Sequence, residues 1–329
     1  MEKFEPKKLP TVLTAEELLD KAFRRASKVS GRNKKEKTIN KLSTVSNVLS
    51  DYFRKIISSH PSYENLPDFY REMVDIVVGI RRIKKSLAAL KWADGVIQRV
   101  ITKGVREVKG GKDPGQVLKA VYGRIASIVE QIDSELRFLN EAKNRMREIP
   151  ILTDDPTIVV AGYPNVGKSS FVARISTVHP EISTYPFTTK EIYVGYGNFD
   201  GLKVQIVDTP GLLDRPIHKR NQIEKRAILC LEHVADCILF IIDPTETCGY
   251  PLESQFSLLD EIKESFNVPI IAAYSKSDMH DRRDLPAFSN VTGEGIDEVV
   301  KLLKNTIEER LKEKKREEEA EDSTGVEKW

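Results

Sequence analysis

The sequence contains little cysteine and no long apolar segment. Three cysteines occur among 329 residues, with no close C-x-x-C pair, which argues against a disulfide framework and a zinc cluster. No apolar run reaches the length of about 18 residues that a membrane-spanning helix needs, and residues 1–6 lack the apolar core of a signal peptide. We therefore expect a cytoplasmic protein without a membrane partner, whose cysteines are buried thiols: Cys230, Cys237 and Cys248.

The near-neutral charge hides a strong asymmetry between the two halves of the chain. The net charge is +2, but residues 1–150 hold 31 of the 52 Lys and Arg and 19 of the 50 Asp and Glu, a net of +12. The remainder holds 21 against 31, a net of −10. A chain of this length favours two domains. The basic half is expected to have a polyanionic partner of its own.

Residues 1–148 predict a basic helical bundle. Glycine and proline are scarce inside long segments in which apolar residues recur every three or four positions. Dense basic clusters at 34–37 and 81–85 indicate contact with nucleic acid, and a solvated helix face is the alternative interpretation. We expect an antiparallel bundle built from a helix that opens with a capping box at Thr14 to Glu17, and from helices over about 35–59, 68–103 and 113–147.

Beyond a proline-punctuated linker at 149–156, short apolar strands alternate with helices. This alternation is typical of a doubly wound, mostly parallel sheet, and we expect it over residues 157–312. The charged stretch 313–329 predicts a disordered tail. The expected strands centre on Val159, Tyr193, 204–207, 238–242 and 270–273, with a weaker candidate at 287–288.

Gly162 to Ser169 (GYPNVGKS) is a complete phosphate-binding loop between a predicted strand and a predicted helix. Triphosphate oxygens must meet several backbone N–H groups at once, which such a glycine loop can aim inward. Lys168 would lie against the β- and γ-phosphates, and the Ser169 hydroxyl would ligate Mg²⁺. The residues expected to hold the phosphates are Asn165, Val166, Gly167, Lys168, Ser169 and Ser170.

Two further segments are placed to sense the γ-phosphate. The Asp208 carboxylate, at the end of a predicted strand, can reach Mg²⁺ through water, and the Gly211 N–H can contact the γ-phosphate. Thr189, before the second strand, would join Mg²⁺ and the γ-phosphate, and we favour it over Thr188. The expected metal ligands are thus Ser169, Thr189 and Asp208, and the expected catalytic residues are Lys168, Thr189 and Gly211.

Two downstream segments match the base-reading motifs of GTPases. In 275–278 (SKSD), the Asp278 carboxylate can accept two parallel donors, which guanine presents and adenine does not. Lys276 would pack its stem along the ring. In 289–295 (SNVTGEG), the backbone of Ser289 and Asn290 would contact the guanine carbonyl, so guanine is the expected base.

These five motifs stand in the order found in GTPases, and the chain resembles the Obg branch. The basic helical domain ahead of them is similar to that of the nucleolar GTP-binding protein family, in a shorter, archaeal-type form. The resemblance implies GTP hydrolysis to GDP, coupled to assembly of the large ribosomal subunit, with the helices on ribosomal RNA. Two alternatives stay open: a scaffold that holds GTP without turnover, and a membrane-linked, stress or translation GTPase whose helices bind protein. The sequence sets no oligomeric state.

Two positions depart from the GTPase pattern. Ser275 replaces the usual asparagine, which shortens a side chain that braces the phosphate loop. Leu212 stands where Ras-like proteins place the glutamine that orients water, so we expect slow intrinsic hydrolysis. Help could come from K⁺, because Asn165 occupies the position of an asparagine in relatives that use K⁺, or from the assembling ribosome in trans.

Overall fold

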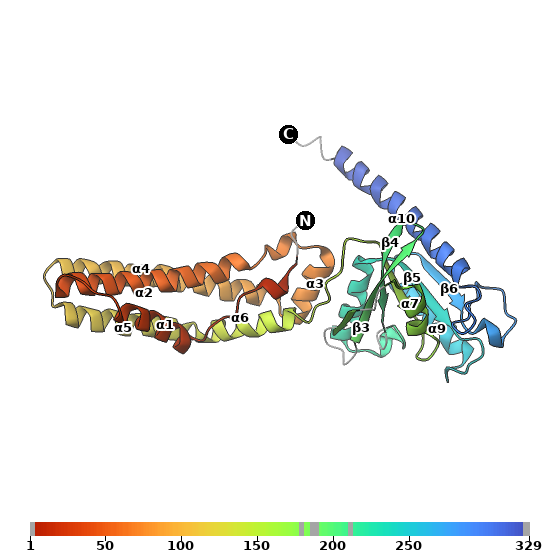
Figure 1. Cartoon of the computed structure of the whole chain (residues 1–329), viewed down its shortest axis with the longest axis horizontal. Helices are drawn as coiled ribbons and strands as arrows, with labels where there is room; N and C mark the ends of the chain where they lie inside the picture. The colour runs from red at the N-terminus through yellow and green to blue at the C-terminus, as the bar shows by residue number, and fades with distance from the viewer. Residues whose placement is uncertain (1–3, 178–180, 185–190, 210–212, 325–329) are drawn as a thin grey trace. The chain divides into compact units, whose positions relative to one another are not determined.

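The computed structural model of this chain describes residues 4–177, 181–184, 191–209 and 213–324. The chain divides into two units, Met1–Arg147 and Glu148–Trp329. Figure 1 shows that helices alone build the first unit, whereas the second contains a sheet with helices packed around it.

The first unit is an all-helical bundle, as the sequence predicts. The capping box is present, since the Thr14 hydroxyl accepts from the Glu17 N–H at 3.3 Å and the Glu17 carboxylate accepts from the Thr14 N–H at 2.8 Å. Short 3₁₀ turns lie at Pro6–Lys8 and Tyr63–Asn65. The α-helices are α1 (Ala15–Ser27), α2 (Lys34–Ser59), α3 (Asp68–Val77), α4 (Ile80–Lys109), α5 (Pro114–Gln131) and α6 (Asp133–Met146).

Two of the expected helices are each broken into two. The helix expected over 68–103 ends at Val77 and starts again at Ile80, because Gly79 takes a positive φ of 86° that no α-helix accommodates. The helix expected over 113–147 breaks at Ile132, whose ψ of 10° departs from helical values. Apolar spacing continues across both breaks, so periodicity alone could not locate them.

Polar side chains join α2 to α4 within the bundle. The Ser46 hydroxyl donates to the side-chain oxygen Oε1 of Gln98 at 3.0 Å, and the side-chain Nε2 of Gln98 donates to the Ser50 hydroxyl at 2.5 Å. Ser50 in turn bonds Asp94. Buried hydroxyls need such partners, since a buried donor left without one costs about 1–3 kcal/mol. These side-chain hydrogen bonds therefore fix the register of α2 against α4, the two longest helices of the unit.

The second unit is built on one six-stranded sheet in the order β2-β3-β4-β1-β5-β6. Its strands are parallel from β4 to β6, whereas β2 and β3 run antiparallel at one edge. The sheet is thus mostly parallel, as predicted. The strands are β1 (Thr157–Ala161), β2 (Glu181–Thr184), β3 (Glu191–Phe199), β4 (Leu202–Asp208), β5 (Ala235–Ile242) and β6 (Ile270–Tyr274).

Helices cover the sheet and connect its strands. The α-helices are α7 (Lys168–Ile175), α8 (Gln222–Leu229), α9 (Leu252–Ser265) and α10 (Ile296–Thr324), and 3₁₀ turns lie at Ile217–Lys219, Cys230–His233 and Ser277–Met279. Helix α7 packs on β3 and β4, α9 on β5, and α10 on β3, β5 and β6. Strand β5 is buried along its whole length, which is typical of a central parallel strand.

The structure differs from the expected elements of this unit at three places. Strand β2 has no counterpart among the predicted strands, because four residues give too short a pattern. Residues 287–288 form only an isolated bridge, between Ala287 and Tyr274. The supposed tail remains helical through Thr324, since α10 runs that far and Lys314 reaches the Asp236 carboxylate at 2.6 Å.

The three cysteines are buried free thiols, as expected. Within 4–177, 181–184, 191–209 and 213–324, we find no helix with the length and apolar character needed to cross a membrane.

The bundle contains one histidine, His60, which is half-buried. His60 follows α2, and its Nδ1 lies 2.6 Å from the Tyr63 hydroxyl oxygen. Burial lowers the pKa of His60 to about 4. In an unfolded chain the pKa is about 6.5, so acidification between these values protonates the unfolded state first. The stability that neutral His60 contributes is therefore present above about pH 6.5 and is lost as the pH falls towards 4.

We predict that His60→Gln reduces the acid sensitivity of the helical unit. Between pH 7.5 and pH 5 the wild type should lose about 2 kcal/mol more unfolding free energy than the variant. Urea unfolding followed by Trp92 fluorescence, in a Trp329→Phe background, measures the difference. Identical pH dependence in both proteins would show that His60 is not the titrating group.

Candidate functional site

The phosphate loop joins β1 to α7 along a path that only glycine permits at two points. Gly162 has a φ of 133°, and a Cβ there would lie 2.4 Å from the Ile241 carbonyl oxygen. Gly167 has a φ of 101° and directly precedes the first residue of α7. Both positions therefore exclude larger residues. The loop delivers the amino terminus of α7, where backbone N–H groups favour an anion, to the carboxyl edge of the sheet.

Lys168 is the buried cation of this loop. Its ammonium donates to the carbonyl oxygens of Gly162 at 2.8 Å and Tyr163 at 2.7 Å, and the residue is 6% exposed. Burial lowers the pKa of Lys168, and nearby carboxylates, Asp208 first among them, oppose that shift. The loop thus folds around its own lysine and holds a positive charge at its centre.

Ser169 and Asp208 meet beside the loop, as a shared metal site requires. The Ser169 hydroxyl donates to Asp208 Oδ2 at 2.6 Å. Asp208 is 1% exposed, and its other oxygen, Oδ1, is buried with no partner among the described residues. Burial raises the pKa of Asp208, while the bond from Ser169 and the charge of Lys168 lower it. A hydroxyl and an unpaired carboxylate oxygen are the ligand types that Mg²⁺ prefers, so the pair fits such an ion.

Sheet register explains this meeting. Strands β1 and β4 are parallel neighbours, and Val160 pairs with Asp208. Thr209 then donates its hydroxyl to the Val160 carbonyl oxygen at 2.8 Å. Residues at the carboxyl ends of adjacent parallel strands share one edge of the sheet. Thr189, Gly211 and Leu212, which the sequence places at the γ-phosphate, lie outside the described residues.

The other loop residues differ in exposure. Val166 is buried, whereas Asn165, Ser169 and Ser170 are exposed. Asn165 adopts a left-handed conformation with a φ of 62°, which asparagine tolerates better than most residues. Its backbone alone therefore gives a reason for asparagine at this position, separate from any role towards K⁺.

The two predicted base-reading segments lie together at the end of β6. The Ser277 N–H donates to the carbonyl oxygen of Phe288, the residue before the second segment, at 3.1 Å, which brings the two segments together. Asp278 is exposed, and no described residue donates to its carboxylate. The buried Ser289 hydroxyl accepts from the N–H groups of Val291 and Thr292, both at 3.1 Å, and so shapes the second segment.

Ser275 and Asn290 take roles that the sequence did not predict. Ser275 is fully buried and donates to the Ile242 carbonyl oxygen at 3.3 Å, within the sheet. Asn290 sends its side-chain amide to the Gly167 carbonyl oxygen at 3.0 Å. The phosphate loop is thus contacted by a side chain from the second base-reading segment.

Asp243, which follows β5, is a site neighbour that sequence reasoning missed. Its carboxylate accepts from the Lys276 ammonium at 2.6 Å and from the Cys248 N–H at 2.8 Å. The hydroxyls of Thr245 and Thr247 also donate to it, at 2.5 and 3.1 Å. Burial raises the pKa of Asp243, but these donors together hold it at about 2. An aspartate directly after the apolar run 237–242 was the signal available in the sequence.

The loop after Asp243 also reaches the phosphate loop. The rings of Tyr163 and Tyr250 lie 4.4 Å apart between centroids, and such contacts are worth about 0.5–1.5 kcal/mol. Lys276 has a positive φ of 60°, and its ammonium is turned towards Asp243 and Thr247. Its methylene stem is still available to pack along a base.

The helical unit carries a basic groove between α1 and α2. It has a volume of about 830 Å³ and is lined on one side by Lys21, Arg25 and Lys28 and on the other by Asn47, Asp51, Tyr52 and Lys55. None of the four cations has an ion-pair partner among the described residues. The Lys21 ammonium lies 5.7 Å from the centroid of the Tyr52 ring. The groove therefore combines unpaired positive charge with an aromatic face.

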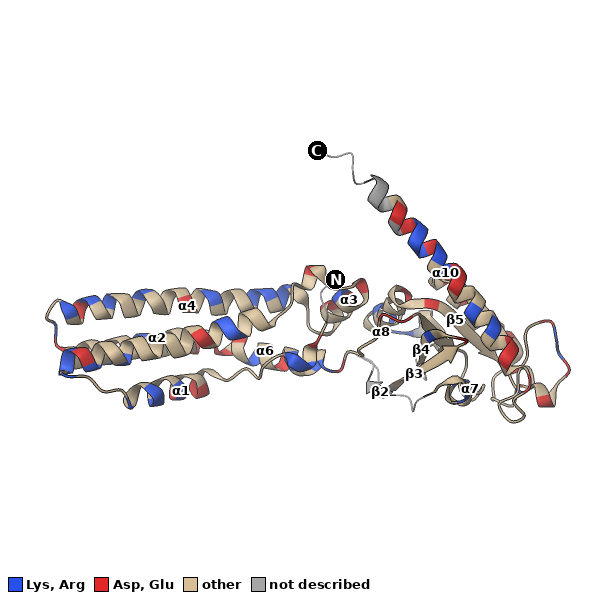
Figure 2. Cartoon of the chain, turned by 45° about the horizontal axis from the view of Figure 1, so that its top comes forward, with Lys and Arg blue, Asp and Glu red and all other residues tan. Residues whose placement is uncertain are grey.

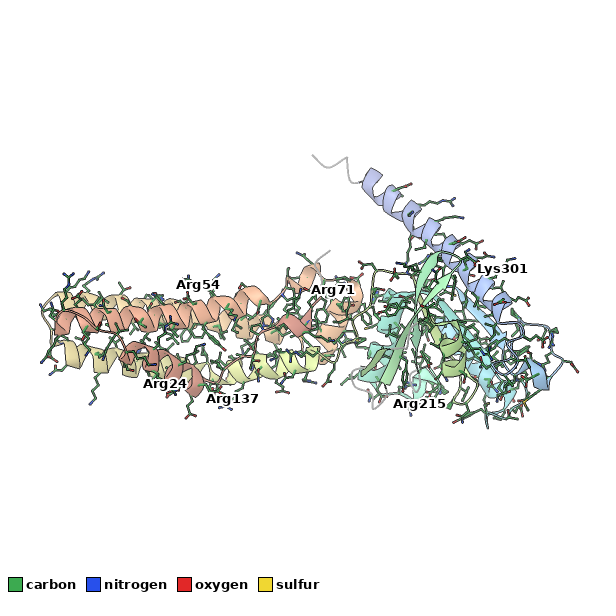
Figure 3. The ribbon with its side chains drawn as sticks, viewed as in Figure 1. Arg24, Arg54, Arg71, Arg137, Arg215 and Lys301 are labelled. Carbon is green, nitrogen blue, oxygen red and sulfur yellow. The ribbon has the colours of Figure 1, made fainter. Side chains whose placement is uncertain are left out.

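Basic side chains also extend beyond the groove. Figure 2 shows Lys and Arg distributed along α1, α2 and α4. In Figure 3, Arg24 on α1 and Arg137 on α6 project away from the bundle. Both are engaged in exposed ion pairs, with Asp20 and Asp133. The four groove cations are distinguished from these because no carboxylate in the described part of the chain pairs with them.

The sheet order, the loop around Lys168 and the aspartate that ends β4 define a P-loop α/β domain of the GTPase class, preceded by an all-helical domain. A family model for the NOG1 N-terminal helical domain matches residues 6–153, and one for nucleolar GTP-binding protein 1 matches residues 222–278. The chain belongs to the nucleolar GTP-binding protein 1 family.

Individual relatives support this membership. An uncharacterised protein of Methanocaldococcus jannaschii is 42% identical over 288 residues, which cover 84% of this chain and 81% of the relative. Nucleolar GTP-binding protein 1 of Saccharomyces cerevisiae is 31% identical over 298 residues, which cover 85% of this chain and 45% of the relative. The chain spans less than half the length of the relatives of that name that it matches.

A crystal structure from Plasmodium falciparum, of a protein assigned as nucleolar GTP-binding protein 1, is also similar. It is 34% identical, and the match covers 54% of this chain and 97% of that chain, with a TM-score of 0.45. The fold is defined by the strand order and the motifs described above and does not depend on this superposition.

Proposed function

We propose that this protein binds GTP and GDP with Mg²⁺, hydrolyses GTP to GDP and phosphate, and acts as a nucleotide switch in assembly of the large ribosomal subunit. The observation that supports nucleotide binding best is the joint placement of Lys168, Ser169 and Asp208 at the phosphate loop. The exposed Asp278 carboxylate beside the second base-reading segment supports guanine as the base. Several relatives also carry the name nucleolar GTP-binding protein 1.

Each residue of the site has a proposed part in hydrolysis. Lys168 and the N–H groups at the start of α7 would stabilise charge on the β- and γ-phosphates. Ser169, Thr189 and Asp208 would hold Mg²⁺, Asp208 through water. Bound Mg²⁺ supplies charge neutralisation between the β- and γ-phosphates. Loss of the γ-phosphate would release Thr189 and the Gly211 N–H, which makes the protein a switch.

Asp278 provides the sharpest test of base recognition. Xanthine carries a carbonyl where guanine carries its exocyclic amine. Asp278→Asn replaces an acceptor by a donor and should therefore favour xanthine. We predict that the variant loses at least about 100-fold in GTP affinity and gains XTP binding. Competition against fluorescent GDP and fluorescent XDP measures both.

A control separates lost recognition from lost folding. Asp281→Asn changes another exposed aspartate three residues away and should leave GTP affinity unchanged. Loss of GTP affinity in Asp278→Asn without any gain for XTP would contradict the assignment of Asp278 to the base.

We also propose that K⁺ activates hydrolysis through Asn165. Leu212 cannot orient water, so another group must supply charge or positioning, and K⁺ beside the phosphates would supply charge. We predict phosphate release at least about tenfold faster in KCl than in NaCl at equal ionic strength. Asn165→Gly keeps the left-handed backbone but should abolish the difference. Equal turnover in the two salts would favour the assembling ribosome as the source of the missing group.

We propose ribosomal RNA as the partner of the helical unit. The net charge of +12 in residues 1–150 supports a polyanion, and the groove between α1 and α2 concentrates unpaired cations beside Tyr52. Phosphates bind such cations with release of counterions, and an aromatic face can stack on an unpaired base. A cytoplasmic location and the absence of a membrane partner remain predictions from the sequence.

The groove can be tested by removing its charge. We predict that the salt dependence of ribosomal RNA binding by the full chain becomes weaker when Lys21, Arg25, Lys28 and Lys55 are changed to Gln. The magnitude of the negative slope of log affinity against log salt should decrease by about 3. Filter binding over a range of KCl concentrations measures this slope.

A matched variant carries Gln at Lys91, Arg99, Lys103 and Lys109, which are exposed along α4. It removes the same charge and should decrease the magnitude of the slope by about 1 or less. Equal effects in the two variants would mean that the charge of the bundle matters but the groove does not. Binding by the wild type that does not vary with salt would remove the electrostatic basis of RNA contact.

A further inference from the structure

The Asn290 side chain crosses from the second base-reading segment to the phosphate loop. Its Nδ2 donates to the Gly167 carbonyl oxygen at 3.0 Å. The same oxygen accepts the Phe171 N–H at 3.0 Å, within the first turn of α7. Because a carbonyl oxygen can only accept, the amide must present its NH₂ group to Gly167, and this fixes its orientation.

The Asn290 side chain lies close against the backbone of Gly167. A Cβ on Gly167 would lie 2.8 Å from Asn290 Nδ2, so the approach depends on glycine at 167. Arg174, on α7, donates to the carbonyl oxygen of Asn290 at 2.8 Å and to that of Val291 at 3.2 Å. These bonds hold the segment against the helix that the phosphate loop begins.

Ser275 does not make the equivalent contact. It occupies the position where GTPases place an asparagine that braces the phosphate loop, but its hydroxyl donates to Ile242, at the end of β5. Ser275 is fully buried in that position, and its side chain is shorter than that of asparagine. A brace from residue 275 is therefore missing, while one from residue 290 is present.

We propose that Asn290 is the residue that positions the phosphate loop for nucleotide in this chain, in place of the asparagine missing at 275. This rests on the proposed nucleotide-binding function. The backbone of Asn290 is already assigned to the guanine carbonyl. One residue then joins base recognition to the loop that holds the phosphates.

The test compares Asn290→Ala with Asn198→Ala in the full chain. Asn198 also bonds a backbone group, the Gly201 N–H at 2.7 Å, but it lies near the end of β3, where the chain turns towards β4. Asn290→Ala should weaken GDP and GTP by the same factor, about fivefold to tenfold, which one hydrogen bond can supply. The two nucleotides should respond alike because, in the proposed site, Gly167 would lie beside the phosphates that they share. Asn198→Ala should leave both affinities unchanged.

Two further variants distinguish positioning from a general structural role. Asn290→Asp sets a carboxylate against the Gly167 carbonyl, so it should weaken GDP more than Asn290→Ala does. Ser275→Asn added to Asn290→Ala restores a brace from the usual position and should recover most of the lost affinity. Dissociation of fluorescent GDP, together with melting of the nucleotide-free proteins, gives both readouts.

The outcomes separate the inference from the function on which it rests. Wild-type affinity in Asn290→Ala, or a lower melting temperature with unchanged GDP dissociation, would overturn the positioning role and leave nucleotide binding intact. Equal affinity in Asn290→Ala and Asn290→Asp would also overturn it, even if the double variant does not fold. Absence of GDP binding by the wild type would overturn both.

Discussion

The candidate site depends on a loop that folds around the buried ammonium of Lys168. Two carbonyl oxygens of the loop accept from it, and Gly162 lets the chain pass against the Ile241 carbonyl where a Cβ would collide. A buried ammonium without such partners would carry a desolvation cost of several kcal/mol. The sequence of the loop therefore fixes its conformation, and that conformation directs the start of α7 and the Ser169 hydroxyl towards Asp208.

Three contacts connect the phosphate loop and the segments that surround it, two of them made by the loop itself. Asn290 bonds Gly167, Tyr163 packs on Tyr250, and the loop that carries Tyr250 begins at Asp243, which binds Lys276. Each contact joins segments that are far apart in the sequence. Together they make the phosphate-binding and base-reading segments one connected structure, in which a change at one segment can alter the geometry of another.

Local motifs allowed much of this site to be predicted. The phosphate loop, Gly162 to Ser169, is recognisable from its own residues, and Asp208 is recognisable from its place at the end of a strand. Because the two strands are parallel neighbours, Ser169 and Asp208 were expected to meet, and they do. The Asn290 contact spans 123 positions and depends on how far one side chain reaches, which no local pattern encodes.

The same reasoning explains the success and failure of the fold prediction. Helical and sheet units followed from periodicity, which is a property of whole segments. The helix break at Gly79 could not be predicted in this way, because the apolar spacing continues before and after the one residue whose φ is positive. Strand β2 was missed because its edge pairing with β3, rather than its four residues, defines it. Helix α10 continues through the charged segment to Thr324, and within that segment Lys314 reaches Asp236, a tertiary contact that composition does not reveal.

The most direct test of the account is calorimetric titration of the nucleotide-free full chain with GTP, GDP and ATP in the presence of Mg²⁺. A site that grips phosphates around Lys168 and reads guanine through Asp278 predicts saturable binding of GTP and GDP, with ATP at least about 100-fold weaker. Equal affinity for ATP and GTP would contradict the assignment of the base-reading segments. Absence of binding by any of the three would contradict the site itself.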